Sequence, residues 1–188
     1  MNKPPVFVTG NQHKANYLAK LLEIELRHQK VELDELQSLD LHEIVEHKVR
    51  QAYDVIRAPV LVEDVSLEFC ALGKLPGPFI KWFLESAGEE ACCRMLDSFV
   101  DRKAILRCTF GYYNGKTVRL FDSESLGRIS QTPKGDNGFG FDRIFICDGY
   151  DITRAEMALE ENERTYYERM KPINKVRDFL KSDTSFML

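Results

Sequence analysis

Pro59-Val60-Leu61-Val62-Glu63-Asp64 is an aliphatic stretch that is apolar on both faces and ends in two adjacent carboxylates. A strand with two apolar faces belongs in the interior of a sheet that helices cover. The stretch therefore predicts a buried strand of an α/β fold, and its two final acids are candidates for function.

Toward the N-terminus of this stretch, strand and helix patterns alternate. We expect a strand at residues 6–8, a helix at 13–26, a strand at 31–36 and a helix at 42–56. Asp40 precedes the second helix, and Glu43 follows three residues later, a spacing that predicts a capping box.

Toward the C-terminus, the sequence predicts a hairpin among shorter helices. Asn114-Gly115 is a strong two-residue turn signal between strands at 104–113 and 117–126. The other expected elements are a rigid turn at 75–78, helices at 79–84 and 89–99, strands at 127–131 and 143–147, and helices at 160–170 and 172–181. The fold class is therefore α/β, a central mixed β-sheet flanked by helices.

Length and composition restrict the class of protein. The chain has 188 residues, so we expect one domain over residues 1–188. A net charge of −4 gives no basic surface for a nucleic-acid polymer, and no apolar run approaches the roughly 18 residues of a membrane span.

The N-terminus and the cysteines indicate the compartment. The N-terminus lacks the apolar core of a signal peptide, and five cysteines without a C-x-x-C pair predict buried free thiols. We expect a cytoplasmic protein that does not bind membranes.

The segment TGNQHK (residues 9–14) connects the first strand to the first helix. Free N–H groups at a helix N-terminus favour an anion, and Lys14 adds a positive charge one turn into the helix. The segment lacks the further glycines and the Lys-Ser/Thr pair of a Walker A loop. By itself the segment is better described as an ordinary strand-to-helix turn with a surface lysine, because short motifs have low specificity.

Glu63 and Asp64 have the chemistry of a magnesium site. Mg²⁺ prefers one or two carboxylates together with phosphate oxygens. The alternative is a strand end with two solvated acids. Lys81, in an otherwise apolar helix, either extends along that surface to solvent or delivers a charge into a cleft.

A glycine-rich loop, GDNGFG (residues 135–140), leads into Phe141-Asp142. Its glycines permit close approach to a ligand, and Phe139 and Phe141 offer planar faces for a base. A flexible loop with core aromatics fits the same pattern. In contrast, HEIVEH (residues 42–47) is not a zinc motif, because its histidines are five residues apart, not four.

Four ordered motifs together resemble the inosine triphosphate pyrophosphatase (Ham1-type) family. They are TGN-x-x-K (9–14), PVLVED (59–64), LPGPFIKWF (75–83) and FGFD (139–142). The resemblance covers most of the chain. It implies a two-lobed single domain with a cleft, Mg²⁺-dependent hydrolysis of ITP, XTP and dITP to the monophosphate and pyrophosphate, and a homodimer.

The resemblance also implies roles for individual residues. Asp64, Lys14 and Lys48 are the implied catalytic residues, and Glu63 and Glu35 are the implied further metal ligands. The implied substrate-binding residues are Thr9, Gly10, Asn11, Lys14, Lys48, Lys81, Phe139, Gly140, Phe141, Asp142, Asn162 and Tyr167.

The C-terminal signature departs from the family pattern. Family members carry a lysine and then a Ser-His-Arg triplet that contact the base and phosphates. The corresponding positions here are Asn162, Tyr166, Tyr167 and Glu168. A carboxylate at Glu168 repels a triphosphate, and a small shift in register brings Arg164 or Arg169 forward to compensate.

Three hypotheses follow from this departure. The first is an active pyrophosphatase with altered base specificity, which the retained acids and lysines favour. The second is a catalytically impaired homologue that binds nucleotides in a regulatory or partner-binding role. The third is a purely structural dimer, which leaves the lysines without a purpose.

Overall fold

The computed structural model describes residues 4–10 and 12–182, and its main feature is a mixed sheet. The strand order is β2-β1-β3-β5-β6-β7, and β4 pairs with β3. β1 (Val6–Val8) is parallel to both β2 (Arg27–Gln29) and β3 (Val60–Phe69), whereas β6 (Val118–Ile129) and β7 (Phe145–Cys147) are antiparallel. The mixed sheet flanked by helices confirms the predicted fold class.

The chain forms two compact units. The first comprises Met1–Asp64, Thr109–Asp122 and Pro172–Leu188, and the second comprises Val65–Cys108 and Ser123–Lys171. Strands β3, β5 (Lys103–Tyr113) and β6 each contribute residues to both units.

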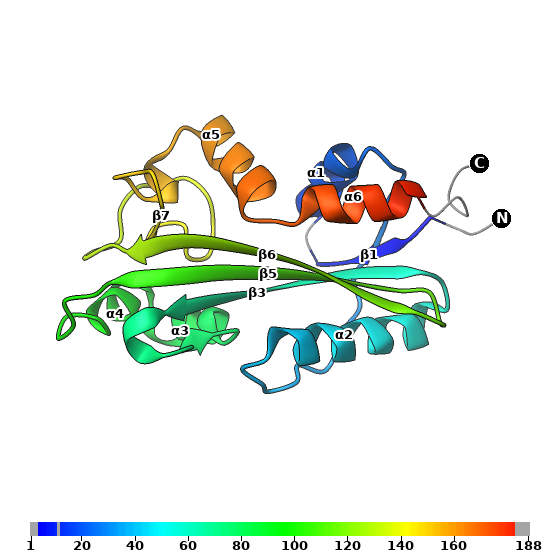
Figure 1. Cartoon of the computed structure of the whole chain (residues 1–188), viewed down its shortest axis with the longest axis horizontal. Coiled ribbons are helices and arrows are strands. Elements are labelled where there is room, and N and C mark those ends of the chain that lie inside the picture. The colour runs from blue at the N-terminus through cyan, green and yellow to red at the C-terminus, as the bar shows by residue number, and fades with distance from the viewer. Residues whose placement is uncertain (1–3, 11, 183–188) are drawn as a thin grey trace. The chain divides into compact units, whose positions relative to one another are not determined.

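In the first unit, helices cover both faces of the strands. Helices α1 (Gln12–Leu22) and α6 (Ile173–Ser182) lie on one face, and α2 (Leu41–Ile56) lies on the other (Figure 1). The core under α2 combines Val45 and Val49 of the helix with Val60 and Val62 of β3, all fully buried. Because side chains alternate along a strand, this packing assigns the even-numbered positions of β3 to the α2 face.

Two predictions for the first unit were wrong in detail. The second strand is β2, not residues 31–36, because its parallel pairing with β1 is made by a polar sequence without the expected apolar alternation. Helix α1 ends at Leu22, not at residue 26, since Glu23 adopts a left-handed backbone (φ 55°).

The cap of α2 also differs from the predicted capping box. Asp40 accepts a hydrogen bond from the His42 N–H at 2.8 Å, as expected of an N-cap. Glu43, however, accepts from the Ser38 hydroxyl at 2.8 Å, and Ser38 in turn accepts from the Asp40 N–H. Ser38 therefore replaces Glu43 as the partner of the cap backbone.

The second unit contains short helices and the C-terminal parts of the sheet. Helices α3 (Ile80–Ala87) and α4 (Glu89–Arg94) lie on one face, and α5 (Leu159–Arg164) lies on the other (Figure 1). The remaining elements are η1 (Cys70–Leu72), β4 (Pro76–Gly77), η2 (Arg154–Glu156) and a π-helical turn, η3 (Thr165–Arg169). The predicted hairpin is confirmed, but its turn belongs to the first unit. Strands β5 and β6 are neighbours in the sheet, and Asn114 Oδ1 accepts from the N–H groups of Lys116 and Thr117.

Several predicted helices and strands of the second unit were too long or too short. The strand predicted at 127–131 is not a separate strand but the last part of β6, and the strand predicted at 143–147 is shortened to β7, which begins at Phe145. Helix α4 stops at Arg94 because Arg102 binds the Cys93 carbonyl at 2.7 Å, and the following residues form tighter i→i+3 turns. The helix predicted at 160–170 becomes α5 and then the π-helical turn, which admits extra residues and changes the register after Arg164.

All five cysteines are free, as predicted. Cys92, Cys93, Cys108 and Cys147 are buried, but Cys70 is exposed at the start of η1, contrary to the expectation that all five are buried. Among the described residues, no helix is long and apolar enough to cross a membrane.

Candidate active site

Two lysine–carboxylate pairs form in the middle of β3, which continues to Phe69 and does not end at Asp64 as the sequence predicted. Lys14 Nζ of α1 lies 2.6 Å from Glu63 Oε1, and Lys48 Nζ of α2 lies 2.8 Å from Asp64 Oδ2. All four residues belong to the first unit. The structure therefore brings together three helix and strand segments that are separate in the sequence.

The two pairs lie on opposite faces of β3. Val62 packs under α2, so alternation places Asp64 on the α2 face and Glu63 on the α1 face. The side chain of Glu63 is only 3% exposed, whereas those of Asp64 and Lys48 are about a quarter exposed. Asp64 is therefore the acid that a ligand can reach directly.

The turn before α1 is held by a residue that the sequence analysis did not single out. His28 Nε2 lies 2.6 Å from the Thr9 carbonyl, and the Thr9 N–H donates to the Gln29 carbonyl at 3.2 Å. Since a carbonyl only accepts, Nε2 carries the proton in this contact. Gly10 is exposed beside this anchor, and Asn11 lies outside the described residues.

Glu35 is exposed on the segment that connects β2 to α2. Its neighbour Asp34 is tied to α2, because the Asp34 N–H donates to Gln51 Oε1 at 3.0 Å and Gln51 Nε2 donates to Asp34 Oδ2 at 3.1 Å. Across the described part of the chain, no three histidine, cysteine, aspartate or glutamate side chains form a group suited to hold a metal ion. The three predicted acids are thus not a preassembled site, and the assignment of Glu63 and Glu35 to a metal stays a prediction.

The histidines of α2 have separate environments. His42 Nε2 lies 2.9 Å from Asp122 Oδ1, which also accepts from the Thr109 hydroxyl at 2.7 Å. The Nδ1 atom of His47 is buried and has no hydrogen-bond partner in the described structure. His47 is therefore partly buried, whereas His42 is exposed.

In the second unit, Lys81 lies exposed on α3. Its Nζ lies 5.3 Å from the centre of the Trp82 ring, a cation–π distance. Trp82 is itself about half exposed. This contact fits the interpretation that Lys81 extends along an apolar surface to solvent.

Asp142 is the buried centre of the glycine-rich loop. Its Oδ2 accepts from the Phe139 N–H at 3.0 Å, and its Oδ1 lies 2.5 Å from Arg154 Nη1. Gly138 packs so closely that a Cβ there would lie 2.1 Å from Asp142 Oδ2, and its φ is +83°. Asp142 and Gly138 therefore fix the conformation of the turn that carries Phe139.

The aromatic residues of this region differ in exposure. Phe139 is 57% exposed and meets the Tyr166 ring edge-on at 5.5 Å. Phe141 is buried and packs against Phe145 at 6.3 Å, so it does not present a face for a base as the sequence suggested. Gly140 is exposed beside Phe139, whereas Asn162 and Tyr167 are buried.

Arg154 is the second residue that the sequence analysis missed. It is 1% exposed, and its Nη2 donates to Asn162 Oδ1 at 2.6 Å. Burial raises the pKa of Asp142 above its usual value, and Arg154 opposes this effect only in part. The available signal was a cation eight residues before the altered position 162.

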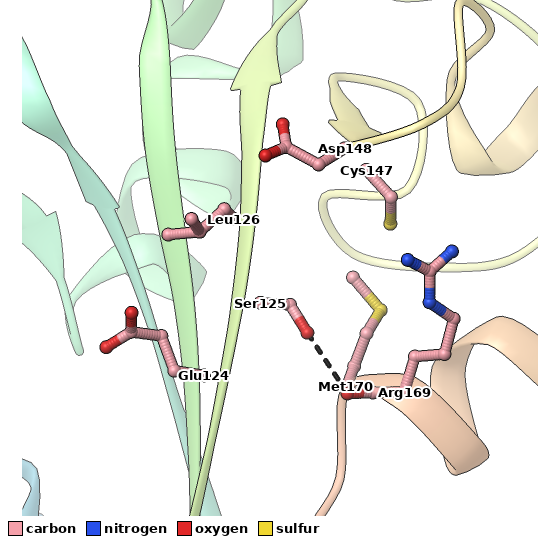
Figure 2. Close-up of a pocket in the computed structure, with 7 residues that line it drawn as sticks. All are labelled: Glu124, Ser125, Leu126, Cys147, Asp148, Arg169 and Met170. Carbon is pink, nitrogen blue, oxygen red and sulfur yellow. Dashed lines mark hydrogen bonds between the residues drawn. The ribbon is translucent and has the colours of Figure 1, made fainter.

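A pocket of about 190 Å³ opens at the edge of β6 in the second unit. It is lined by Glu124, Ser125, Leu126, Cys147, Asp148, Arg169 and Met170, and Figure 2 shows the side chains of Arg169 and Cys147 turned toward each other. Burial raises the pKa of the Cys147 thiol to about 11. Glu124 pairs with Arg107, and Arg169 lies 5.7 Å from the Tyr150 ring, so these two charged groups already have partners within the unit.

Comparisons with known proteins agree with the motifs. The family model described as the Ham1 family matches residues 5–179. An inosine triphosphate pyrophosphatase of Schizosaccharomyces pombe is 38% identical over 95% of this chain and 95% of its own, and inosine triphosphate pyrophosphatase 2 of Trypanosoma cruzi is 41% identical over 87% and 85%. The structure of the Staphylococcus aureus Ham1 protein has the same fold, with a TM-score of 0.83, 23% identity, and coverage of 96% of this chain and 100% of that one. The chain therefore belongs to the Ham1 family.

Proposed function

We propose that this protein hydrolyses non-canonical purine nucleoside triphosphates (ITP, XTP and dITP) to the nucleoside monophosphate and pyrophosphate, with Mg²⁺. The observation that carries the proposal is the accessible Lys48–Asp64 pair at 2.8 Å on the α2 face of β3. The names of the curated relatives, which are 38% and 41% identical over most of the chain, support the same activity.

The first unit supplies the groups proposed to bind the triphosphate. Lys14 near the start of α1 and Lys48 on α2 provide cations, and the backbone at Thr9 and Gly10 precedes the N-terminus of α1, where a helix favours anions. Lys81, which belongs to the second unit, is proposed on the resemblance alone as a further phosphate-binding lysine. The two ion pairs hold Lys14 and Lys48 in place before substrate arrives, which lowers the entropy lost on binding.

Asp64 suits a magnesium ion that arrives with the substrate. Mg²⁺ retains waters and takes one or two protein carboxylates together with phosphate oxygens, so a single accessible aspartate is sufficient. When bound, the ion polarises a phosphoryl oxygen and lowers the pKa of a coordinated water. Glu63 and Glu35 are the proposed second acids, and metal titration of single Glu63→Gln and Glu35→Gln variants separates them.

The chain's own residues then perform positioning and charge neutralisation. Cleavage between the α- and β-phosphates needs a water on the α-phosphorus in line with the departing pyrophosphate. Asp64 orients that water, and the lysine ammonium groups compensate the charge that develops on the phosphate oxygens. A homodimer in the cytoplasm is part of the proposal on family grounds.

The alternative proposal is a catalytically impaired homologue that binds nucleotides. The altered positions Asn162, Tyr167 and Glu168 favour it, whereas the intact Lys48–Asp64 pair favours catalysis. Pyrophosphate release from ITP, XTP, dITP, GTP, ATP, CTP and UTP, with Mg²⁺ and with EDTA, distinguishes the two. We expect metal-dependent turnover of ITP or XTP, and no release from any nucleotide would contradict the proposal.

A further inference from the structure

Arg154 links three segments of the second unit from a buried position. Its Nη1 lies 2.5 Å from Asp142 in the glycine-rich loop, and its Nη2 donates to Asn162 of α5. Its guanidinium carbon lies 4.5 Å from the centre of the Tyr166 ring in the π-helical turn. With 1% exposure, this side chain interacts with protein groups and not with solvent.

The contact with Asp142 extends to the exposed Phe139 ring. Asp142 uses one oxygen for Arg154 and the other for the Phe139 N–H. Phe139 also rests on Tyr166, the ring over which the Arg154 guanidinium lies. Arg154 therefore supports Phe139 from two directions, through the turn backbone and through the neighbouring ring.

The local sequence holds Arg154 in place. Thr153 and Glu156 form a capping box around η2, in which the Thr153 N–H donates to Glu156 Oε2 at 2.8 Å. The Thr153 hydroxyl donates to the Lys134 carbonyl at 2.9 Å. Arg154 Nε is buried without a hydrogen-bond partner in the described structure. An unsatisfied buried polar atom costs stability, and it calls for an explanation such as a functional role of the side chain.

We propose that Arg154 is a positioning residue that holds the Phe139–Asp142 turn as the platform for the purine base, in place of a cation at position 162. This inference rests on the proposed function, because it concerns the base of the same substrate. The short contact between Arg154 Nη2 and Asn162 Oδ1 means that a lysine at 162 would bring its ammonium group close to the space that the guanidinium occupies. We therefore expect a lysine at 162 to pair with Asp142 when Arg154 is removed.

The test compares Arg154→Gln, Arg154→Lys and the double variant Arg154→Gln/Asn162→Lys. Arg128→Gln is the matched control, since Arg128 also pairs with an aspartate, Asp151, at 3.0 Å but is exposed. The dissociation constants of ITP and of tripolyphosphate, which has no base, are measured by calorimetry. The KM and kcat for ITP and the melting temperature are measured alongside.

We expect Arg154→Gln to weaken ITP binding about tenfold or more, because it removes charged hydrogen bonds. Tripolyphosphate binding and kcat should change less than about threefold. Arg154→Lys, which keeps the charge but loses the forked contact, should lie between Arg154→Gln and wild type. The double variant should recover most of the ITP affinity.

Equal weakening of ITP and tripolyphosphate overturns the inference, as does an Arg154→Gln variant that binds ITP like Arg128→Gln. If Arg154→Gln does not fold, the lysine variant decides, and ITP affinity equal to the control again overturns the inference. The primary readout is binding. A wild-type protein that binds ITP without turnover therefore contradicts the proposed function and leaves the Arg154 test intact.

Discussion

Two regions of the molecule pair carboxylates with cations, but at different burial: the middle of β3 in the first unit, with Glu63 and Asp64, and the Asp142 region in the second. Lys48 and Asp64 are each about a quarter exposed, whereas Asp142 and Arg154 are each about 1% exposed. A partly exposed pair opens to admit a ligand at low cost. Removing one partner of a buried pair lowers the free energy of unfolding by several kcal/mol, so such a pair fixes the local structure. Direct contact with a ligand is then made by neighbouring residues.

This difference explains why one region keeps the family motif and the other departs from it. The β3 acids and lysines match the resemblance residue by residue, and each of these groups is proposed to touch phosphate, metal or water. Around Asp142, the side chains act mostly on one another, and Arg154 supplies the cation that pairs with this carboxylate. The cluster thus carries its positive charge at Arg154, whereas position 162, where family members have a lysine, is an asparagine.

The largest predicted effect is the loss of Asp64. Asp64→Asn removes the accessible carboxylate that is proposed to orient water and hold Mg²⁺, so kcat for ITP should fall by about 10²–10⁴-fold, the range for a positioned acid–base group. Pyrophosphate release measures kcat, and ITP binding measures retained affinity. Asp54→Asn, an exposed residue of the same helix-and-strand unit that pairs with Arg57 at 3.2 Å, is the control. A kcat unchanged by Asp64→Asn would remove the distinction between the two regions.

The next prediction concerns the opposite face of β3. Glu63→Gln leaves Lys14 without its 2.6 Å partner, and we expect ITP affinity to change about tenfold with a smaller effect on kcat than Asp64→Asn. The Lys14→Gln variant should show a similar loss. If Glu63 acts through Lys14, the double variant is no worse than Lys14→Gln alone. Additive losses would instead give Glu63 a separate role, such as metal binding.

Much of the first region was predictable from sequence, and the reason is local. Residues 59–64 indicate a buried strand that carries two acids, although that strand continues to Phe69. Residues 9–14 indicate a strand-to-helix turn with a lysine, and neither prediction needs distant parts of the chain. The partners of those acids depend on strand alternation and on which helix covers which face. His28 escaped notice because β2 is a short polar strand that only its pairing with β1 reveals.

The second region was less predictable because its contacts depend on irregular backbone. The π-helical turn at Thr165–Arg169 changes the register after α5, and no periodic pattern in the sequence announces it. Arg154 is directed at Asp142 by the capping box of a single 3-10 turn, η2. An ungapped count along the sequence identifies the missing lysine at Asn162 but cannot identify the residue that replaces it.

A smaller effect is predicted for Gly138→Ala. Gly138 and Gly73 both have positive φ, near +83° and +72°, but only Gly138 has atoms within reach of a new Cβ. Both substitutions should lose about 1 kcal/mol of unfolding free energy from backbone strain. Gly138→Ala should lose about 1–3 kcal/mol more, because the Asp142 carboxylate has to move.

Denaturant unfolding of the two glycine variants measures the difference. ITP affinity should fall in Gly138→Ala and stay constant in Gly73→Ala, since only the first displaces the turn that carries Phe139. Equal losses of unfolding free energy in Gly138→Ala and Gly73→Ala would show that the turn around Asp142 rearranges at little cost. The buried pair would then not be the rigid element that distinguishes the second region.

The smallest predicted effect is on thiol reactivity, which reports how tightly the second unit is packed. Burial raises the pKa of Cys93 and Cys147 from 9.0 to about 11, so at a given pH each holds about 100-fold less thiolate than an ordinary cysteine. Native protein at pH 8 should therefore react with a thiol-specific disulfide reagent at Cys70 alone on the fast timescale, and Cys70→Ser should abolish that phase. Rapid reaction of Cys147 would contradict this prediction and would mean that the pocket beside β6, which Cys147 lines, opens readily to the reagent.

Ligands then show whether the pocket responds to the base. Saturating ITP should slow the reaction of Cys147 if binding of the base stabilises the second unit, whereas tripolyphosphate, which lacks a base, should not.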